Sequence, residues 1–214
     1  MICKFCGKEI KPLMFGGVKG FEIAVCDCPE SQEEIMQVRH ELEDYRRKAY
    51  EDFTAPETGL SERGKNQTFS SFNPEGIEDI YQRVYNYDPK NGSLLLMGRT
   101  GAGKTHLACA VLNKFVSEGN TGRFINFPQF VSERQNNEEL IETPLLVIDE
   151  IGIGGNEYTQ TKLYELVNGR YEKLNPTVYT TNLKKQELLE SIGERNYRRI
   201  KETCEVILVK GVNE

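Results

Sequence analysis

The sequence has no apolar run approaching the roughly 20 residues that a membrane-spanning helix requires. Its first residues lack the apolar core of a secretory signal peptide, and no internal repeat or low-complexity tract interrupts the chain. We therefore expect a cytoplasmic protein that does not associate with membranes. Its 214 residues, 38% of them hydrophobic and 28% charged, suffice for one medium-sized folded domain with a small appendage.

The sequence also lacks an excess of basic residues, since its formal net charge is −6 at pH 7. Proteins that bind nucleic acid over their whole surface carry the opposite sign of charge. This class is therefore excluded, and any contact with DNA or RNA has to come from a local basic patch.

A glycine-rich loop stands between an apolar run at residues 93–97 and a segment at residues 106–112 whose composition suits a helix. Strand, loop and helix follow one another in the order that a phosphate-binding loop (P-loop) requires. Glycines let backbone N–H groups point at an anion, Lys104 can reach the β- and γ-phosphates, and the Thr105 hydroxyl can ligate Mg²⁺. The loop therefore predicts a nucleoside triphosphate site. Its residues are Gly98, Arg99, Thr100, Gly101, Ala102, Gly103, Lys104 and Thr105, followed by His106 in the helix.

Two carboxylates, Asp149 and Glu150, directly follow the apolar run at residues 145–148. Ligands of open α/β sheets bind at the carboxyl ends of the strands, where both side chains are expected. Asp149 is placed to hold Mg²⁺, and Glu150 is placed to orient and polarise an attacking water. Together with the P-loop, the pair predicts hydrolysis of the bound triphosphate.

Asn182 ends the next expected strand, at residues 177–181, and so belongs to the same edge of the sheet. An isolated Asn after a strand is usually a turn residue. At this edge, however, its amide can hydrogen-bond the γ-phosphate or the attacking water. We therefore assign it a sensor role.

Arg195, Arg198 and Arg199 share one face of an expected helix, because they are spaced i, i+3 and i+4. Three interpretations follow from the residues alone: a solvated basic face, a site for DNA phosphates, or an arginine finger that stabilises charge during phosphoryl transfer. The chain ends soon afterwards at Glu214, which leaves no room for a helical lid over the nucleotide. This favours a finger that acts on a neighbouring subunit.

Four of the six cysteines lie in the first 28 residues, as the pairs Cys3 and Cys6 and Cys26 and Cys28. In a cytoplasmic protein such clustering favours metal binding over disulfides. Four thiolates complete a tetrahedral Zn²⁺ site and leave no position for a catalytic water. We therefore expect a structural zinc ion that stabilises a small module over residues 1–29.

Residues 30–53 are charged and favour a helix, and their apolar side chains are spaced as in a heptad repeat. Such a helix either lies on its own domain or binds a partner, and the sequence leaves both open. Residues 54–67 are rich in Pro, Gly, Ser and charge, which predicts a linker. The apolar heptad residues are Ile35, Val38, Leu42, Tyr45 and Ala49.

From residue 68 to residue 214, short apolar strands alternate with amphipathic helices. This alternation predicts an α/β fold, a three-layer sandwich whose central parallel sheet is covered by helices on both faces. Strands are expected at residues 93–97, 123–127, 145–148, 177–181 and 205–209, and helices at residues 77–87, 106–112, 159–173, 185–191 and 194–202.

Four ordered motifs resemble the DnaC/DnaI-type replicative helicase loaders, which are AAA+ ATPases of bacteria and phages closely related to the IstB-like helpers of DNA transposition. They are the P-loop with its following His-Leu-Ala, Leu-Leu-Val-Ile-Asp-Glu-Ile-Gly from residue 145, Tyr-Thr-Thr-Asn-Leu from residue 179, and Gly-Glu-Arg-x-Tyr-x-Arg-Ile from residue 193. The likeness covers about residues 68–209. The cysteine-rich module ahead of it is also similar to that of the loaders.

The resemblance implies an ATPase that binds ATP or ADP with Mg²⁺, forms an ATP-dependent homo-oligomer and engages single-stranded DNA. Such a protein delivers a replicative DNA helicase, which it grips with its N-terminal module. The resemblance makes Arg199 the best match to a trans-acting finger and Arg195 an accessory arginine.

One departure concerns the 17 residues between the strands at 123–127 and 145–148, which are few and acidic where the loaders usually carry an extra helix that lines the DNA path. Two alternatives to a helicase loader stay open: an IstB-like ATPase helper of transposition, and an adaptor that binds ATP with little turnover.

Overall fold

The structure is a computed structural model that describes residues 2–9, 13–14, 22–23, 26–33, 36–37, 58–132 and 137–210. The chain divides into two compact units, Met1–Ala49 and Tyr50–Glu214, and each is considered by itself. Within the described ranges, the helices are all too short or too polar to cross a lipid bilayer.

The first unit contains a small antiparallel ribbon of β1 (Leu13–Met14) and β2 (Glu22–Ile23). A separate bridge joins Ile2 to Glu9 around the first cysteine pair. Residues 29–33 and 36–37 are helical. The apolar heptad residues predicted between 35 and 49 lie outside the described residues.

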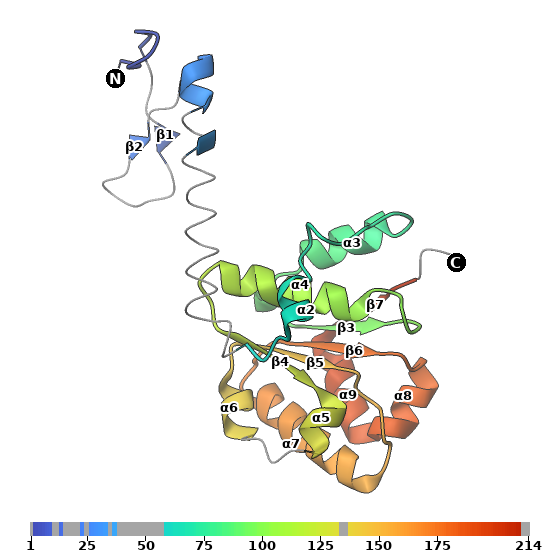
Figure 1. The fold of residues 1–214 in the computed structure, drawn as a ribbon. Helices are drawn as coiled ribbons and strands as arrows, with labels where there is room; N and C mark the ends of the chain where they lie inside the picture. The colour runs from blue at the N-terminus through green and yellow to red at the C-terminus, as the bar shows by residue number, and fades with distance from the viewer. Residues whose placement is uncertain are drawn as a thin grey trace. The chain divides into compact units, whose positions relative to one another are not determined.

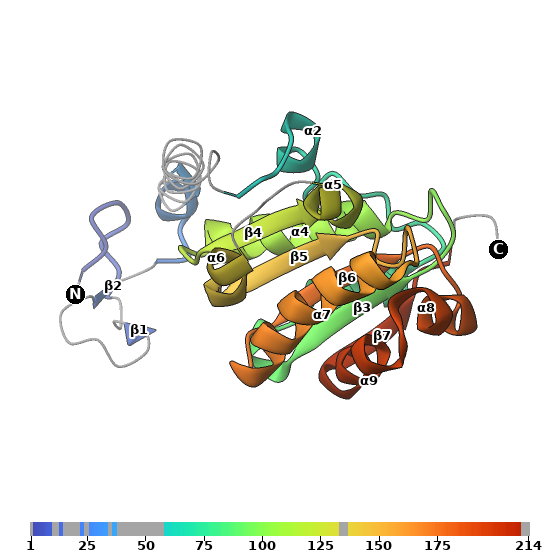
Figure 2. The ribbon, with the colours of Figure 1, turned by 90° about the horizontal axis from the view of Figure 1, so that it is seen from below.

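The second unit is built on a five-stranded sheet in which all neighbouring strands are parallel, in the order β4-β5-β6-β3-β7 (Figures 1 and 2). Parallel neighbours bring the carboxyl ends of the strands to one edge, and the register pairs Met97 with Thr181 and Asn126 with Asp149 there. The strands are β3 (Ser93–Met97), β4 (Gly122–Asn126), β5 (Leu145–Asp149), β6 (Thr177–Thr181) and β7 (Cys204–Leu208).

Helices cover both faces of this sheet, so the predicted three-layer α/β sandwich is confirmed (Figures 1 and 2). Helix α4 packs on one face, with α2 and α3 against it, while α7, α8 and α9 pack together on the other. The helices are α2 (Glu62–Lys65), α3 (Glu78–Tyr85), α4 (Lys104–Ser117), α5 (Phe127–Ser132), α6 (Asn137–Glu142), α7 (Glu157–Glu172), α8 (Lys185–Ile192) and α9 (Glu194–Thr203), with a 3₁₀ turn η1 (Pro89–Asn91).

Alternating side chains of the strands supply two hydrophobic layers, one on each face. In β3, Leu94 and Leu96 belong to the layer under α4, whereas Leu95 belongs to the layer under α7 and α9. Because successive side chains of a strand point to opposite faces, a run that is apolar throughout is buried on both sides. This explains why β3 and β5 are nearly continuous apolar runs in the sequence.

Residues 58–67, which the composition assigned to a linker, are a packed part of the second unit. The Thr58 carbonyl accepts a hydrogen bond from the Phe124 backbone N–H of the edge strand β4, at 2.7 Å. Leu60 is buried in the layer under α4. The Asn113 side chain of α4 donates to the Gly64 carbonyl at 3.0 Å. The prediction of a linker was wrong because segments that pack on the surface of their own domain can be as rich in Gly, Ser and charged residues as linkers are.

Arg170, an arginine of α7, is buried in this unit and has no carboxylate partner among the described residues. Arg170 of α7 is 1% exposed, and its guanidinium donates to the carbonyls of Leu140, Thr143 and Pro176 at 2.6, 2.8 and 2.6 Å and to the Thr177 hydroxyl at 2.7 Å. Burial lowers its pKa to about 10, so it stays charged at neutral pH. Arg170 thereby ties the end of α6 to the start of β6.

Candidate functional site

The P-loop leaves the carboxyl end of β3 and ends where α4 begins, at Lys104. No side chain fits at Gly98, because a Cβ there would lie 2.2 Å from the Val209 carbonyl oxygen. Gly103 has a φ of 90°, which favours glycine, and a Cβ there would lie 2.7 Å from the Phe72 ring. Both glycines therefore hold the loop in a shape that larger residues would not allow.

The side chain of Lys104 points back into the P-loop that precedes it. Its side chain is largely buried, and its ammonium donates to the Arg99 carbonyl at 2.7 Å. Burial lowers the pKa of the ammonium, while the carboxylates of Asp149 and Glu150 oppose that shift. The P-loop lysine and both predicted carboxylates are thus close enough to interact electrostatically.

Asp149, at the end of β5, is joined to the P-loop helix and to the next strand by hydroxyl groups. The Thr105 hydroxyl donates to its carboxylate at 3.0 Å, and the Thr180 hydroxyl of β6 donates at 2.6 Å. Asp149 is 5% exposed, and this burial raises its pKa, with the Glu150 carboxylate adding to the rise and the two hydroxyl groups opposing it. The structure therefore brings together Thr105 and Asp149, the oxygen donors predicted for Mg²⁺.

Glu150 follows in an uncommon backbone conformation, with a φ of 62°. Left-handed conformations cost a non-glycine residue free energy and concentrate at functional sites. Its backbone N–H donates to the Thr180 hydroxyl at 3.0 Å, and its carboxylate accepts a hydrogen bond from the Asn126 amide of β4 at 3.2 Å. Its side chain is therefore oriented from the neighbouring strand.

The prediction from the sequence did not include Asn126 and assigned no role to Thr180. Both occupy the carboxyl ends of the strands that flank β5 in the sheet. The available signal was the polar residue at the end of each apolar strand, but only the strand order reveals which strands are neighbours of β5. Asn126 is therefore a candidate site residue that the structure adds.

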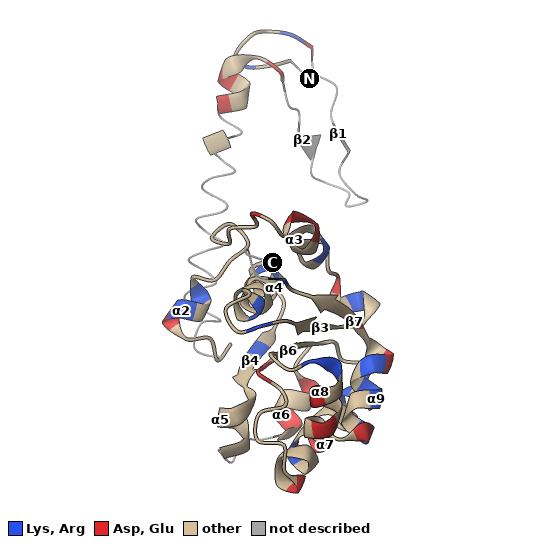
Figure 3. Cartoon of the chain, turned by 90° about the vertical axis from the view of Figure 1, so that its right-hand side faces the viewer, with Lys and Arg blue, Asp and Glu red and all other residues tan. Residues whose placement is uncertain are grey.

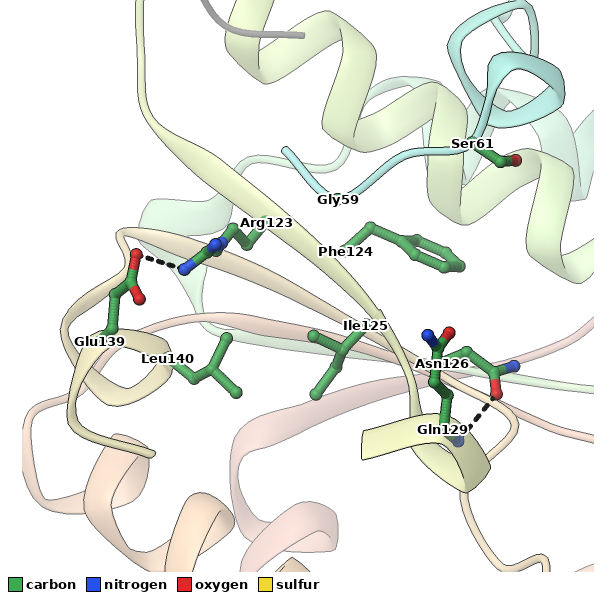
Figure 4. A pocket seen from close by; sticks show the side chains of 9 residues that line it. All are labelled: Gly59, Ser61, Arg123, Phe124, Ile125, Asn126, Gln129, Glu139 and Leu140. Atoms are coloured by element: carbon green, nitrogen blue, oxygen red, sulfur yellow. Dashed lines mark hydrogen bonds and ion pairs between the residues drawn. The ribbon is translucent and has the colours of Figure 1, made fainter. Parts of the chain in front are cut away.

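A pocket of about 510 Å³ opens beside β4, between residues 59–61 and helices α5 and α6 (Figure 4). Asn126 contributes to its wall, and its amide oxygen accepts the Gln129 backbone N–H at 3.3 Å (Figure 4). At the other end of the pocket, Arg123 forms an ion pair with Glu139 (Figure 4). The Asn126 side chain therefore lines this pocket, and its amide nitrogen donates a hydrogen bond to the Glu150 carboxylate.

Asn182 directly follows β6, beside the strand that leads into the P-loop. Its side chain is exposed and has no hydrogen-bond partner in the part of the chain that the structure describes. His106, by contrast, is engaged: its Nε2 lies 3.0 Å from the Thr68 carbonyl oxygen, and its ring meets that of Phe72 edge-on at 5.0 Å. His106 therefore ties the P-loop helix to the preceding segment.

The three predicted arginines of α9 differ in their surroundings, and Figure 3 shows basic residues along this helix with acidic ones among them. Arg195 and Arg198 are exposed, and the Arg198 Nε lies 3.8 Å from the Glu202 carboxylate. Arg199 is half-buried against α7, where its guanidinium carbon lies 5.3 Å from the Tyr164 ring centre. Arg199 is therefore not part of the solvated face.

The four clustered cysteines form a candidate metal centre within the first unit. Their sulfur atoms all lie within 4.8 Å of one another, with 3.8 Å between those of Cys3 and Cys28 and 3.4 Å between those of Cys6 and Cys26. Zn–S bonds of about 2.3 Å in a tetrahedral site require sulfur separations of about 3.8 Å. Backbone N–H groups of Cys6 and Phe5 lower the pKa of the Cys3 thiol to about 7, whereas burial raises the pKa of the Cys28 thiol to about 12. The set therefore fits one tetrahedral metal ion.

The second unit is similar to known proteins. The family model for IstB-like ATP binding protein covers residues 72–211. Over 163 residues the chain is 26% identical to the replicative helicase loader DnaC of Escherichia coli strain K12, a match that covers 67% of this chain and 66% of DnaC, just under two thirds of that protein.

Two solved structures share the fold. The crystal structure of the DnaC helicase loader gives a TM-score of 0.60 at 24% identity and covers 70% of this chain and 100% of that one. The crystal structure of DnaI also gives 0.60, at 18% identity, and covers 70% of this chain and 94% of that one.

The resemblance predicted from the four motifs and the P-loop AAA+ fold are thereby confirmed. Because the family model covers more than half of its residues, the chain belongs to the family of IstB-like ATP binding proteins, which are P-loop AAA+ ATPases.

Proposed function

We propose that this protein is an ATP-dependent loader of a replicative DNA helicase in bacterial or phage DNA replication. The observation that carries the ATPase part is the linked set of Thr105, Asp149 and Thr180, with Glu150 beside it. The loader part is supported by the similarity to DnaC, whose name describes it as a replicative helicase loader. Such a protein acts in the cytoplasm, where the chromosome is replicated.

The residues of the site have distinct roles in this proposal. Lys104 neutralises the β- and γ-phosphates of ATP, and Thr105 and Asp149 hold Mg²⁺, which supplies further positive charge to the phosphate oxygens. Glu150 orients and polarises the attacking water, because it is the carboxylate free of the metal. Asn182, exposed at the same edge, contacts the γ-phosphate or that water.

Arg199 acts as an arginine finger on a second copy of the chain, with Arg195 as an accessory arginine. This assignment is supported by position: Arg199 lines a pocket together with Ser93 and Thr177, the first residues of β3 and β6. The P-loop follows the other end of β3, about 13 Å away at about 3.3 Å per residue. An ATP-dependent homo-oligomer would bring Arg199 to a phosphate.

The cysteine module binds one structural Zn²⁺ and, with the following helix, grips the helicase. This role is supported by the fit of four thiols to a tetrahedral ion.

In this proposal the zinc module spans residues 1–29 and the following helix spans residues 30–53. The ATPase domain starts at residue 58 or earlier, and not at residue 68. Single-stranded DNA is the further partner, because a helicase is loaded where single strands are exposed.

One experiment tests the loader and the switch together. The full chain is co-purified with the replicative helicase of its host in the presence of ATP, of ADP and without nucleotide. We expect a complex whose recovery depends on the nucleotide, and we expect Lys104→Ala to abolish the difference between nucleotides because it removes phosphate binding. Absence of a complex under all three conditions would contradict the loader function.

The family model also favours a second candidate, an ATPase helper of DNA transposition. That function predicts a complex with a transposase and coating of duplex DNA instead of a complex with the helicase. An adaptor with little turnover is the third possibility. Phosphate release measured with and without single-stranded DNA separates it from both, since an adaptor releases none under either condition.

A further inference from the structure

The guanidinium of Arg199 is held by aromatic ring faces. Its central carbon lies 5.3 Å from the ring centre of Tyr164 and 5.0 Å from that of Tyr171, both on α7. Cation–π attraction of this kind uses the face of the ring. The guanidinium makes no hydrogen bond or ion pair with any residue that the structure describes, and its Nη1 is buried without a partner.

The acidic residue one turn further along α9 does not neutralise Arg199. The Glu202 carboxylate instead accepts a hydrogen bond from the Tyr171 hydroxyl at 3.3 Å and lies 3.8 Å from the Arg198 Nε. Arg170, the other arginine in this region, has its donors used by carbonyl and hydroxyl oxygens. The donors of Arg170 are therefore satisfied, whereas those of Arg199 are unused among the residues that the structure describes.

A buried donor without a partner costs free energy, so its acceptor is expected in a functional complex. The pocket that Arg199 lines measures about 570 Å³ and includes Ser93 and Thr177 at the amino ends of β3 and β6. The proposed triphosphate site of the same chain lies at the other end of these strands, next to their carboxyl ends. An oxyanion for Arg199 therefore has to come from another molecule.

We propose that Tyr164 and Tyr171 are positioning residues for Arg199 and hold its guanidinium so that it can bind the triphosphate of a second copy of this chain. The proposal rests on the trans-acting role given to Arg199 above. The rings fix the guanidinium without occupying its N–H groups, which a carboxylate partner would do. The tyrosines thereby orient the charge before assembly, and orientation of this kind strongly affects rate.

Mixed assemblies test this proposal. The donor chain carries Glu150→Gln, which spoils its own site and keeps Arg199, and the receiver chain carries Arg199→Ala. Each alone should release little phosphate, and an equimolar mixture should recover activity. Adding Tyr164→Leu and Tyr171→Leu to the donor should lower the recovered kcat at least tenfold with KM for ATP unchanged. The same two changes in the receiver should alter it less than twofold.

Controls separate positioning from folding. Tyr158→Leu in the donor removes an exposed tyrosine of the same helix and should leave the recovered rate unchanged. Donor chains with Tyr164→Phe and Tyr171→Phe keep the ring faces and should recover most of the rate. A donor with both leucines that is fully active would overturn the role of the tyrosines. A parent mixture that recovers no activity would overturn the trans-acting arginine itself.

Discussion

The Asn126 amide donates a hydrogen bond to the Glu150 carboxylate at 3.2 Å, across the pair of strands β4 and β5. The contact links the residue proposed to polarise the attacking water to a strand at the edge of the sheet. It exists because the parallel register places Asn126 opposite Asp149, the residue before Glu150. The orientation of the Glu150 carboxylate is therefore controlled from a strand that lies outside both the P-loop and the Asp149–Glu150 segment.

Asn126→Ala should lower the rate of ATP hydrolysis in the assembled protein about tenfold, because a carboxylate out of line with the water is a poor general base. ATP affinity should stay unchanged, since Asn126 forms no hydrogen bond with Lys104 or Thr105. Phosphate release and nucleotide titration measure the two effects. As a control, Gln129→Ala removes a neighbouring amide side chain from the same pocket and should leave the rate unaffected. Equal rates for Asn126→Ala and the parent would show the contact to be incidental.

Asp149→Asn should stabilise the fold at pH 7 in the absence of nucleotide. Burial raises the pKa of Asp149 in the folded state above its unfolded value, so ionisation penalises the folded state once the pH exceeds both values. The penalty is absent below the unfolded pKa of about 3.9. The gain in Tm, about 2–4 °C for each kcal/mol, should therefore disappear as the pH is lowered past that value.

Thermal unfolding followed by circular dichroism between pH 3.5 and pH 7 checks this prediction. The exposed acid Glu172 provides the control, since Glu172→Gln should leave Tm unchanged. Asp149→Asn should at the same time weaken Mg²⁺-dependent ATP binding. A variant less stable than the parent at pH 7 would contradict the assigned cost of ionisation.

The purified 214-residue chain should contain about one zinc ion per chain, because four thiols lie within 4.8 Å of one another and can close around one tetrahedral ion. Cys28→Ser should lose the zinc and weaken helicase binding while ATP binding by the second unit persists. Cys204→Ser, which changes a thiol outside the cluster in β7, should keep full zinc content. Elemental analysis measures the ion, and a zinc-free parent protein would rule out the site.

Arg170→Leu should lower the free energy of unfolding by about 3 kcal/mol or more, because it leaves the carbonyls of Leu140, Thr143 and Pro176 buried without donors. Arg83, whose ion pair with Glu205 is half-exposed, is the matched control. Arg83→Leu should cost less than about 1 kcal/mol. Urea unfolding of both variants gives the comparison, and similar losses would contradict the role assigned to Arg170.

The nucleotide site was predictable where its residues are adjacent in the sequence. The P-loop and the pair Asp149 and Glu150 each follow an apolar strand, so their chemistry can be recognised from a short stretch. Asn126 was missed because its nearness to Glu150 depends on the order of strands in the sheet. Arg170 was missed because an arginine near a helix end is usually solvated, and only the fold brings four carbonyl groups around it.

The strand boundaries were predicted to within one residue, because β3 and β5 are almost entirely apolar and β6 is rich in Thr, Val and Tyr, which favour strands. The segment over residues 58–67 was assigned wrongly for the converse reason. Its one buried leucine, Leu60, is surrounded in sequence by Gly, Ser and charged residues. Its packing is decided by what β4 and α4 offer it and not by its own composition.

That segment has a consequence for how the ATPase unit can be isolated. The Thr58 carbonyl occupies a backbone N–H of β4, which is an edge strand. An edge strand with open backbone groups is a template for intermolecular pairing and aggregation. A fragment that began at residue 68 would remove this cap together with Leu60 and expose β4 to other chains. Recombinant fragments of the ATPase should therefore start before Thr58 to remain monodisperse.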